Sequence, residues 1–319
     1  MTSKIYNLII NKTFQLIYKI LIFLTIAVIL YYKINYNQLI STINLKPYSL
    51  LLILIIFLLL LIIIYFIFIR WVNLLSLNKQ NNIDKNKILI AVLYSNLSSE
   101  LSFLGTFVSR AILTLPHKIM FKDVIVTSLL EKILSIFFLG MLTIPGILLL
   151  IYRDHQLLEG FSLFILLFAF FIGSILIIFM FFFKKLNYLL QRSRIFKALK
   201  PYLNLRNLKT PFLHTCVIQL LCYFSLIIIP LILGIELNYI YYIILLPIII
   251  FFSKIPITVT PWGWRELVFI LTMNNIDITN EESFIISIFY GLMCLFTSIL
   301  AVSIFEITSK LKKNIFQIN

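Results

Sequence analysis

The sequence predicts an all-α protein, a polytopic helix bundle that forms a single integral membrane domain. Of its 319 residues, 61% are hydrophobic and only 12% are charged, and the mean hydropathy is +1.06. Soluble domains are about 45–50% apolar and about 25% charged. Apolar runs of the length that crosses a bilayer as a helix recur along the chain. The longest polar connection, residues 184–209, is too short to form a soluble domain.

Six stretches have the length and composition of full membrane spans. They are, in order, Phe14–Tyr32, Pro47–Ile69, Val124–Tyr152, Phe161–Phe183, Phe212–Leu233 and Phe284–Ile307. Arg70 and Trp71 directly follow the second stretch, and we expect them to close that span at the inner interface.

The placement of basic residues predicts the orientation of the chain. Both termini and the 184–209 connection are basic, and basic residues in short connections mark the cytoplasmic side. We therefore expect both termini in the cytoplasm. The net charge of +15 is distributed around the spans and does not form one patch. It indicates anionic lipids at the cytoplasmic face as partners, and no nucleic acid.

Two regions, Ile88–Lys122 and Asn238–Asn280, interrupt the pattern of spans. The first turns rich in serine before Arg110, and the second contains SKIPITVTPWGWRE at residues 253–266. Proline breaks a helix, and non-helical backbone at membrane depth requires cover by protein or a polar cavity. Basic residues flank the first region and acidic residues the second, which favours two re-entrant or broken helices that enter from opposite sides. The alternatives are ordinary interfacial loops with tryptophan anchors, or about eight plain spans.

The order of these segments is the same in the two halves of the chain. Residues 1–155 and residues 156–319 each contain two spans, an interrupted segment and one span, with opposite predicted orientation. Inverted repeats with broken segments at corresponding positions are a recurrent transporter architecture, and the binding site lies where those segments meet. The sequence thus predicts a possible inverted repeat, with the plain helix bundle as the competing arrangement.

The ionisable residues inside or next to these segments are the candidate functional groups. They are Arg110, Glu131, Lys132, Arg265 and Glu266. Charges inside a membrane are costly and often functional, although each acid–base pair could also be a salt bridge that only fixes packing. Arginine suits a phosphate because its planar fork binds two oxygens. Either glutamate would then hold an arginine in place or receive a cationic group, and the helix after Pro261 would offer free N–H groups to an anion.

Catalytic and metal-binding patterns are not visible in the sequence. The three histidines are scattered, and neither a zinc-protease motif, a nucleophile elbow nor a phosphate-binding loop occurs. We therefore expect no metal, no cofactor and no enzyme activity.

The run IPITVTPWGWRE at 255–266 resembles the late motif of the lysylphosphatidylglycerol synthase transmembrane-region family, which is also called flippase-like. The first half is similar too: Gly105 and Arg110 stand where the family has a glycine-rich stretch ending in arginine, and Glu131–Lys132 stands where it has an acid–base pair. The family often carries Pro-Gly and an acidic residue before that arginine, and LGTFVSR has neither. The residues that match the late motif are Pro256, Ile257, Thr258, Gly263, Arg265 and Glu266.

The resemblance implies a membrane domain that handles lipids or lipid-linked molecules. In the best-known members this domain translocates aminoacylated phosphatidylglycerol and precedes a soluble aminoacyl transferase domain, which we do not expect in this chain. We expect a flippase-like protein of the bacterial inner membrane, which binds a phospholipid or lipid-linked substrate in a polar cavity. The alternative is a membrane-embedded glycosyltransferase or an accessory subunit of a glycolipid pathway, and a homo-oligomer stays open. The candidate substrate-binding residues are Arg265, Glu266, Arg110, Glu131, Gly263 and Thr258.

Overall fold

The protein is helical wherever its structure is regular. The computed structural model describes residues 24–35, 38, 43–78, 84–102, 104–114, 119, 121–153, 205–255, 257–276 and 278–318, and no strand occurs among them. A short apolar helix, Leu24–Lys33, is followed by α3 (Ser49–Ser76), α4 (Lys85–Leu101), α5 (Gly105–Thr114), α6 (Phe121–Arg153), α9 (Leu205–Leu233), α10 (Tyr239–Ser253), α11 (Trp264–Met273), the 3₁₀ turn η2 (Asn274–Ile276) and α12 (Asn280–Ile318).

Four helices of the described part, α3, α6, α9 and α12, are long and apolar enough to cross a membrane. They coincide with four of the predicted spans and confirm the prediction of a polytopic helix bundle. The predicted span Phe161–Phe183, the beginning of Phe14–Tyr32 and most of the basic 184–209 connection lie outside the described residues. Helix α3 does not end at Ile69, where its unbroken apolar run ends, but continues to Ser76.

The first interrupted region forms two short helices, α4 and α5, that fold back on each other. The break follows Ser102, whose backbone is extended (φ −157°, ψ 138°). The hydroxyls of Ser98 and Ser109 then meet at 2.9 Å across the pair. Gly105 makes this close approach possible, because a Cβ there would lie 2.1 Å from the carbonyl oxygen of Ser98. With 17 and 10 residues, each helix is shorter than the roughly 20 residues that a span requires.

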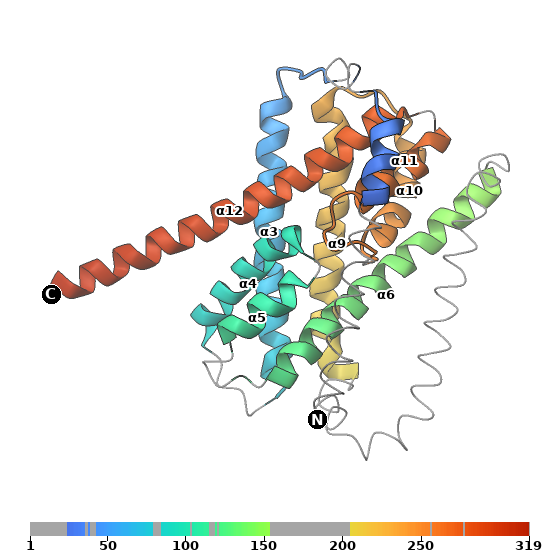
Figure 1. The fold of residues 1–319 in the computed structure, drawn as a ribbon. Helices are drawn as coiled ribbons and strands as arrows, with labels where there is room; N and C mark the ends of the chain where they lie inside the picture. Colours follow the sequence, from blue (N-terminus) through green and yellow to red (C-terminus); the bar gives the residue numbers. More distant parts are fainter. Residues whose placement is uncertain are drawn as a thin grey trace, which may run out of the picture.

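The second interrupted region likewise forms two short helices, α10 and α11, of 15 and 10 residues. The chain between them is irregular and ends at Gly263, whose φ of 87° lies in the left-handed region that favours glycine. In the view of Figure 1, α4 and α5 lie in the lower half of the molecule and α10 and α11 in the upper half. Whether the two halves of the chain are inverted repeats stays a prediction.

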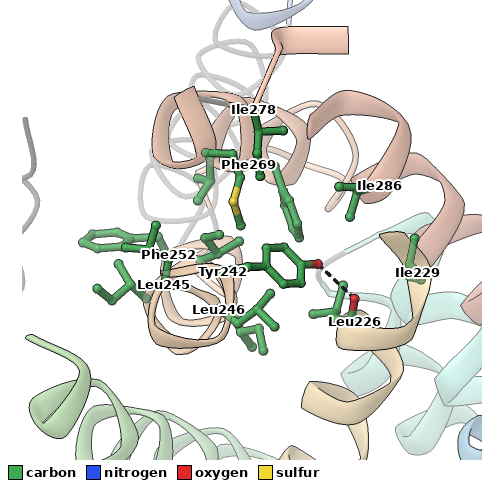
Figure 2. Close-up of a cluster of buried hydrophobic side chains, with 14 of the residues drawn as sticks. Leu226, Ile229, Tyr242, Leu245, Leu246, Phe252, Phe269, Ile278 and Ile286 are labelled. Atoms are coloured by element: carbon green, nitrogen blue, oxygen red, sulfur yellow. Dashed lines mark hydrogen bonds between the residues drawn. The ribbon is translucent and has the colours of Figure 1, made fainter. Parts of the chain in front are cut away.

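Helix α10 lies at the centre of the largest hydrophobic cluster. Its sequence is apolar on all sides, which is typical of a helix enclosed by other helices, and Leu245 and Leu246 are fully buried. Figure 2 shows α10 beside α9, α11 and α12, which contribute Ile229, Phe269 and Ile286 to the cluster. Because α11 packs against α10 in this cluster, the charged residues at the start of α11 have a fixed place inside the bundle.

Two tyrosines replace backbone hydrogen bonds that prolines remove from α9 and α10. Pro230 has no N–H for the carbonyl of Leu226 one turn earlier, and the hydroxyl of Tyr242 donates to that oxygen at 2.9 Å, as Figure 2 shows. In the same way, Pro247 of α10 frees the carbonyl of Ile243, and the Tyr223 hydroxyl of α9 donates to it at 2.5 Å. Each helix therefore satisfies the polar group that proline leaves open in the other.

The Leu24–Lys33 helix and α12 enclose α11 from other sides. Ile26 and Leu30 pack against Leu267 and Ile270 of α11, and Figure 1 shows the short blue helix beside α11. The carboxylate of Glu281, at the start of α12, accepts a hydrogen bond from the Asn35 backbone at 2.7 Å. Helix α11 is thus covered on several faces, which explains why all but one of its residues from 265 to 273 are buried.

Candidate functional site

A first charged cluster joins α3, α5 and α6 inside the bundle. The carboxylate of Glu131 on α6 accepts from Arg70 Nε of α3 at 3.1 Å and from Arg110 Nη1 of α5 at 2.5 Å. The exposed fractions of Glu131, Arg110 and Arg70 are 5%, 2% and 6%. Two arginines therefore share one carboxylate, and the cluster carries an excess of positive charge.

Hydroxyl groups and an aromatic ring complete the surroundings of the first cluster. Arg110 donates to Ser95 of α4 at 3.2 Å and to Ser128 of α6 at 3.4 Å, and Arg70 donates to Thr215 of α9 at 3.1 Å. The Arg110 guanidinium lies over the Trp71 ring, 4.4 Å from its centroid, in a cation–π contact. The serine-rich stretch predicted to interrupt a span thus supplies a hydrogen-bond acceptor, Ser95, for Arg110.

The structure adds two details to the predictions for this cluster. Arg70 and Trp71 lie inside the bundle: Trp71 is fully buried and donates to Thr127 at 3.0 Å, and Arg70 pairs with Glu131. Their place at the inner interface of the membrane stays a prediction. Glu131 binds the arginines, while its neighbour Lys132 lies over the ring of Phe107, 4.5 Å from its centroid.

A second charged cluster forms at the start of α11. Arg265 donates to Glu266 Oε1 through Nη2 at 2.9 Å and through Nε at 3.2 Å, and it also donates to Ser287 of α12 at 3.2 Å. The other oxygen of Glu266 accepts the Gly263 N–H at 2.5 Å. This carboxylate caps the first turn of α11, so the Gly263 N–H is already occupied and is not free for an anion.

Arg265 is held between aromatic rings and the backbone of α12. Its guanidinium lies 4.9 Å from the ring centroid of Trp262 and 6.0 Å from that of Tyr290. Gly291 leaves room for it, because a Cβ there would lie 2.1 Å from Arg265 Nη2. Thr258 is buried at 3% exposure, and its hydroxyl donates to the carbonyl of Thr260. Thr258, one of the predicted site residues, therefore stabilises the loop between α10 and α11 and does not contact Arg265 through this hydroxyl.

The two interrupted regions touch each other at this second cluster. The Trp262 indole N–H donates to the backbone carbonyl of Glu100, at the end of α4, at 2.9 Å, and the Glu100 carboxylate interacts with the charges of Arg265 and Glu266. One turn earlier in α4, Asn96 donates to Ser298 of α12 at 2.9 Å. The second cluster thus contains one arginine paired with one carboxylate, and the end of α4 with Glu100 packs beside it.

Paired charges of this kind can either fix the packing of the helices or bind a charged ligand. Each arginine already has a carboxylate partner, so a bound anion would compete with Glu131 or Glu266. Among the described residues, no group of three or more His, Cys, Asp or Glu side chains could hold a metal ion.

Comparison with known families identifies the chain. The model of the family described as the lysylphosphatidylglycerol synthase TM region matches residues 16–301. The chain belongs to this family. Both charged clusters and both pairs of short helices fall within the matched range, and the family together with the apolar helices makes this an integral membrane protein in lipid metabolism or transport. No curated protein and no solved structure matches it.

Proposed function

We propose that this protein binds a phospholipid or a lipid-linked headgroup and moves it across the membrane, without chemical catalysis. A headgroup that crosses about 30 Å of hydrocarbon loses its hydrogen bonds to water, at several kcal/mol for each polar group left unpaired. Buried arginines, carboxylates and hydroxyls along a polar cavity would replace those bonds.

The meeting of the two interrupted regions is the observation that carries this proposal. The loop before α11 binds the end of α4 through Trp262, and each region supplies one buried arginine, Arg110 or Arg265, beside a glutamate. Broken helices that meet and present charged groups are typical of transporter binding sites. In the resting protein, Glu131 and Glu266 occupy the arginines, and a phosphate would replace them during passage.

The excess of positive charge in the first cluster supports a headgroup that carries a phosphate. An excess of cations around Glu131 favours an anion there, because charge-assisted hydrogen bonds to arginine are the strong ones. At the second cluster, the Glu266 carboxylate, which already accepts from Arg265, could accept a hydrogen bond from a cationic or hydroxyl-bearing portion of the same headgroup. A headgroup with both kinds of polar group could therefore contact both clusters.

Reconstitution into vesicles tests the proposal. Purified protein is placed in phosphatidylcholine vesicles that contain fluorescent phosphatidylglycerol, and dithionite reports how fast the inner label reaches the outer leaflet. We expect Arg265→Gln and Arg110→Gln to slow the movement at least about tenfold, since a hydrogen bond to a charged group contributes about 1.5–3 kcal/mol and 1.4 kcal/mol is tenfold.

The control is Lys87→Gln, which removes an exposed lysine that pairs with Asp84 at 3.6 Å and should leave the rate unchanged. Wild-type protein that moves no lipid above the rate of empty vesicles, for several phosphate-bearing headgroups, would refute transport. Equal rates for wild type and both arginine variants would instead exclude the two clusters from the path.

A further inference from the structure

A third cation lies between the two clusters, and no carboxylate of the described residues forms an ion pair with it. Lys254 follows the end of α10, and its ammonium group donates to Gln219 Oε1 of α9 at 2.8 Å. The buried arginines of both clusters pair with a glutamate, whereas the hydrogen-bond partner of Lys254 is a neutral amide. A lysine ammonium has three donors, so this contact uses only part of its capacity.

Helix α9 connects Lys254 to the first cluster. Thr215, which accepts from Arg70, and Gln219, which accepts from Lys254, are four residues apart and therefore lie on one face of α9, about 6 Å apart along its axis. The charge of Arg70 acts on Lys254 as well. Two cations are thus anchored one helical turn apart on the same polar face of α9.

The same face leads to the second cluster. Cys222 of α9, three residues after Gln219, and Tyr290 of α12 pack against the same hydrophobic cluster. Tyr290 in turn lies beside the guanidinium of Arg265. Lys254 therefore stands between the two clusters that the proposed path joins, and not at the outside of the bundle.

Among the residues that the structure describes, no carboxylate pairs with the Lys254 ammonium. Removing a cation from water is expensive unless an opposite charge compensates it, and Gln219, itself 2% exposed, supplies only a dipole. Arg70 adds repulsion. Lys254 itself is only partly exposed.

We infer that Lys254 binds the phosphate of a lipid headgroup, at a subsite separate from the Arg265–Glu266 pair. The inference rests on the proposed function only for the source of the phosphate, because a phosphate anion from either a lipid or solution would satisfy the same chemistry. A phosphate beside Lys254 would neutralise its charge and reduce the repulsion from Arg70. Phosphate oxygens are suitable acceptors for the donors that Gln219 leaves open.

Ligand-dependent thermal stability tests this site. Wild-type protein, Lys254→Met, Lys254→Arg and the exposed control Lys87→Met are purified in a neutral sugar detergent. Each is heated with short-chain phosphatidylglycerol, with the phosphate-free short-chain diacylglycerol, or with inorganic phosphate. Lys254→Met removes a charge without a counterion, so without lipid it should unfold at the same temperature as wild type or higher.

We expect phosphatidylglycerol to raise the unfolding temperature of wild type by about 5 °C at about 100 times its Kd. Lys254→Met should bind it at least about tenfold more weakly, while Lys254→Arg and Lys87→Met bind it like wild type. Equal binding by Lys254→Met and wild type would overturn the inference, as would equal stabilisation of wild type by diacylglycerol.

Further results distinguish a lipid phosphate from inorganic phosphate, and the Lys254 subsite from lipid transport. Stabilisation by inorganic phosphate alone, lost in Lys254→Met, would reject the lipid headgroup as its source. Binding of phosphatidylglycerol that depends on Lys254, in a protein that moves no lipid in vesicles, would support this subsite and refute transport. Lipid movement that is independent of Lys254, with unchanged binding, would refute the subsite and leave transport standing.

Discussion

Glu131 is the shared counterion of two buried arginines, and removing its charge should destabilise the protein strongly. Glu131→Gln keeps the size of the side chain but leaves Arg70 and Arg110, which contact its oxygens at 3.1 and 2.5 Å, without a negative charge. Loss of one partner from a buried pair costs about 3–5 kcal/mol. Because two cations lose their partner at once, we expect the free energy of unfolding to fall by at least about 3–5 kcal/mol, a large share of the 5–15 kcal/mol typical of proteins.

Unfolding in mixed micelles, followed by tryptophan fluorescence, measures this loss. The matched control is Asp84→Asn, which removes an exposed carboxylate 3.6 Å from Lys87 and keeps a residue that caps α4 well. Its expected effect is below about 1 kcal/mol. The double variant Arg110→Gln/Glu131→Gln also removes one of the unpaired cations. Its loss of unfolding free energy should therefore be smaller than the sum of the losses of the two single variants, by about 0.5–3 kcal/mol. Additive losses, or a loss for Glu131→Gln no larger than for Asp84→Asn, would refute the reasoning.

Two further predictions concern the elements that hold the site. Tyr242→Phe leaves the buried carbonyl of Leu226 unpaired and should lower the free energy of unfolding by about 1–3 kcal/mol. In a Pro230→Ala background the new N–H of residue 230 can reach that carbonyl, so thermal unfolding should show a smaller loss from the same substitution. An equal loss in both backgrounds would contradict this role of Tyr242. Gly291→Ala places a methyl group where the Arg265 guanidinium lies, so we expect slower lipid movement in vesicles with little change in unfolding temperature, because the guanidinium is the flexible end of its side chain. An unchanged rate would show that Arg265 does not need this position.

Much of the fold could be predicted because composition constrains it strongly. Long apolar runs specify spans, and the described helices α3, α6, α9 and α12 coincide with predicted ones. Prolines around Gly263 and the serines before Arg110 indicated where a helix breaks. The pairing of Arg265 with Glu266 could also be expected, since both lie in one short motif.

The membership of Arg70 and Trp71 in the site could not be read from the end of an apolar run. A polar pair after an apolar run is typical of an interface, yet the helix continues for another turn. A signal was present: Trp71, Leu74 and Leu75 repeat at helical spacing and are fully buried. The sequence allowed the expectation that Glu131 holds an arginine, but it did not show that two arginines, Arg70 and Arg110, share it. Which arginines reach it depends on how α3 and α5 pack against α6.

The exchanged tyrosine bonds between α9 and α10 have a mechanical consequence. Sliding or rotating one helix against the other would leave the carbonyls of Leu226 and Ile243 without donors, and each orphaned group costs several kcal/mol in an environment without water. These two helices therefore move as one rigid body. In the proposed transport, an opening of the protein would therefore separate other helices, such as α5, whose Arg110 pairs with Glu131 of α6.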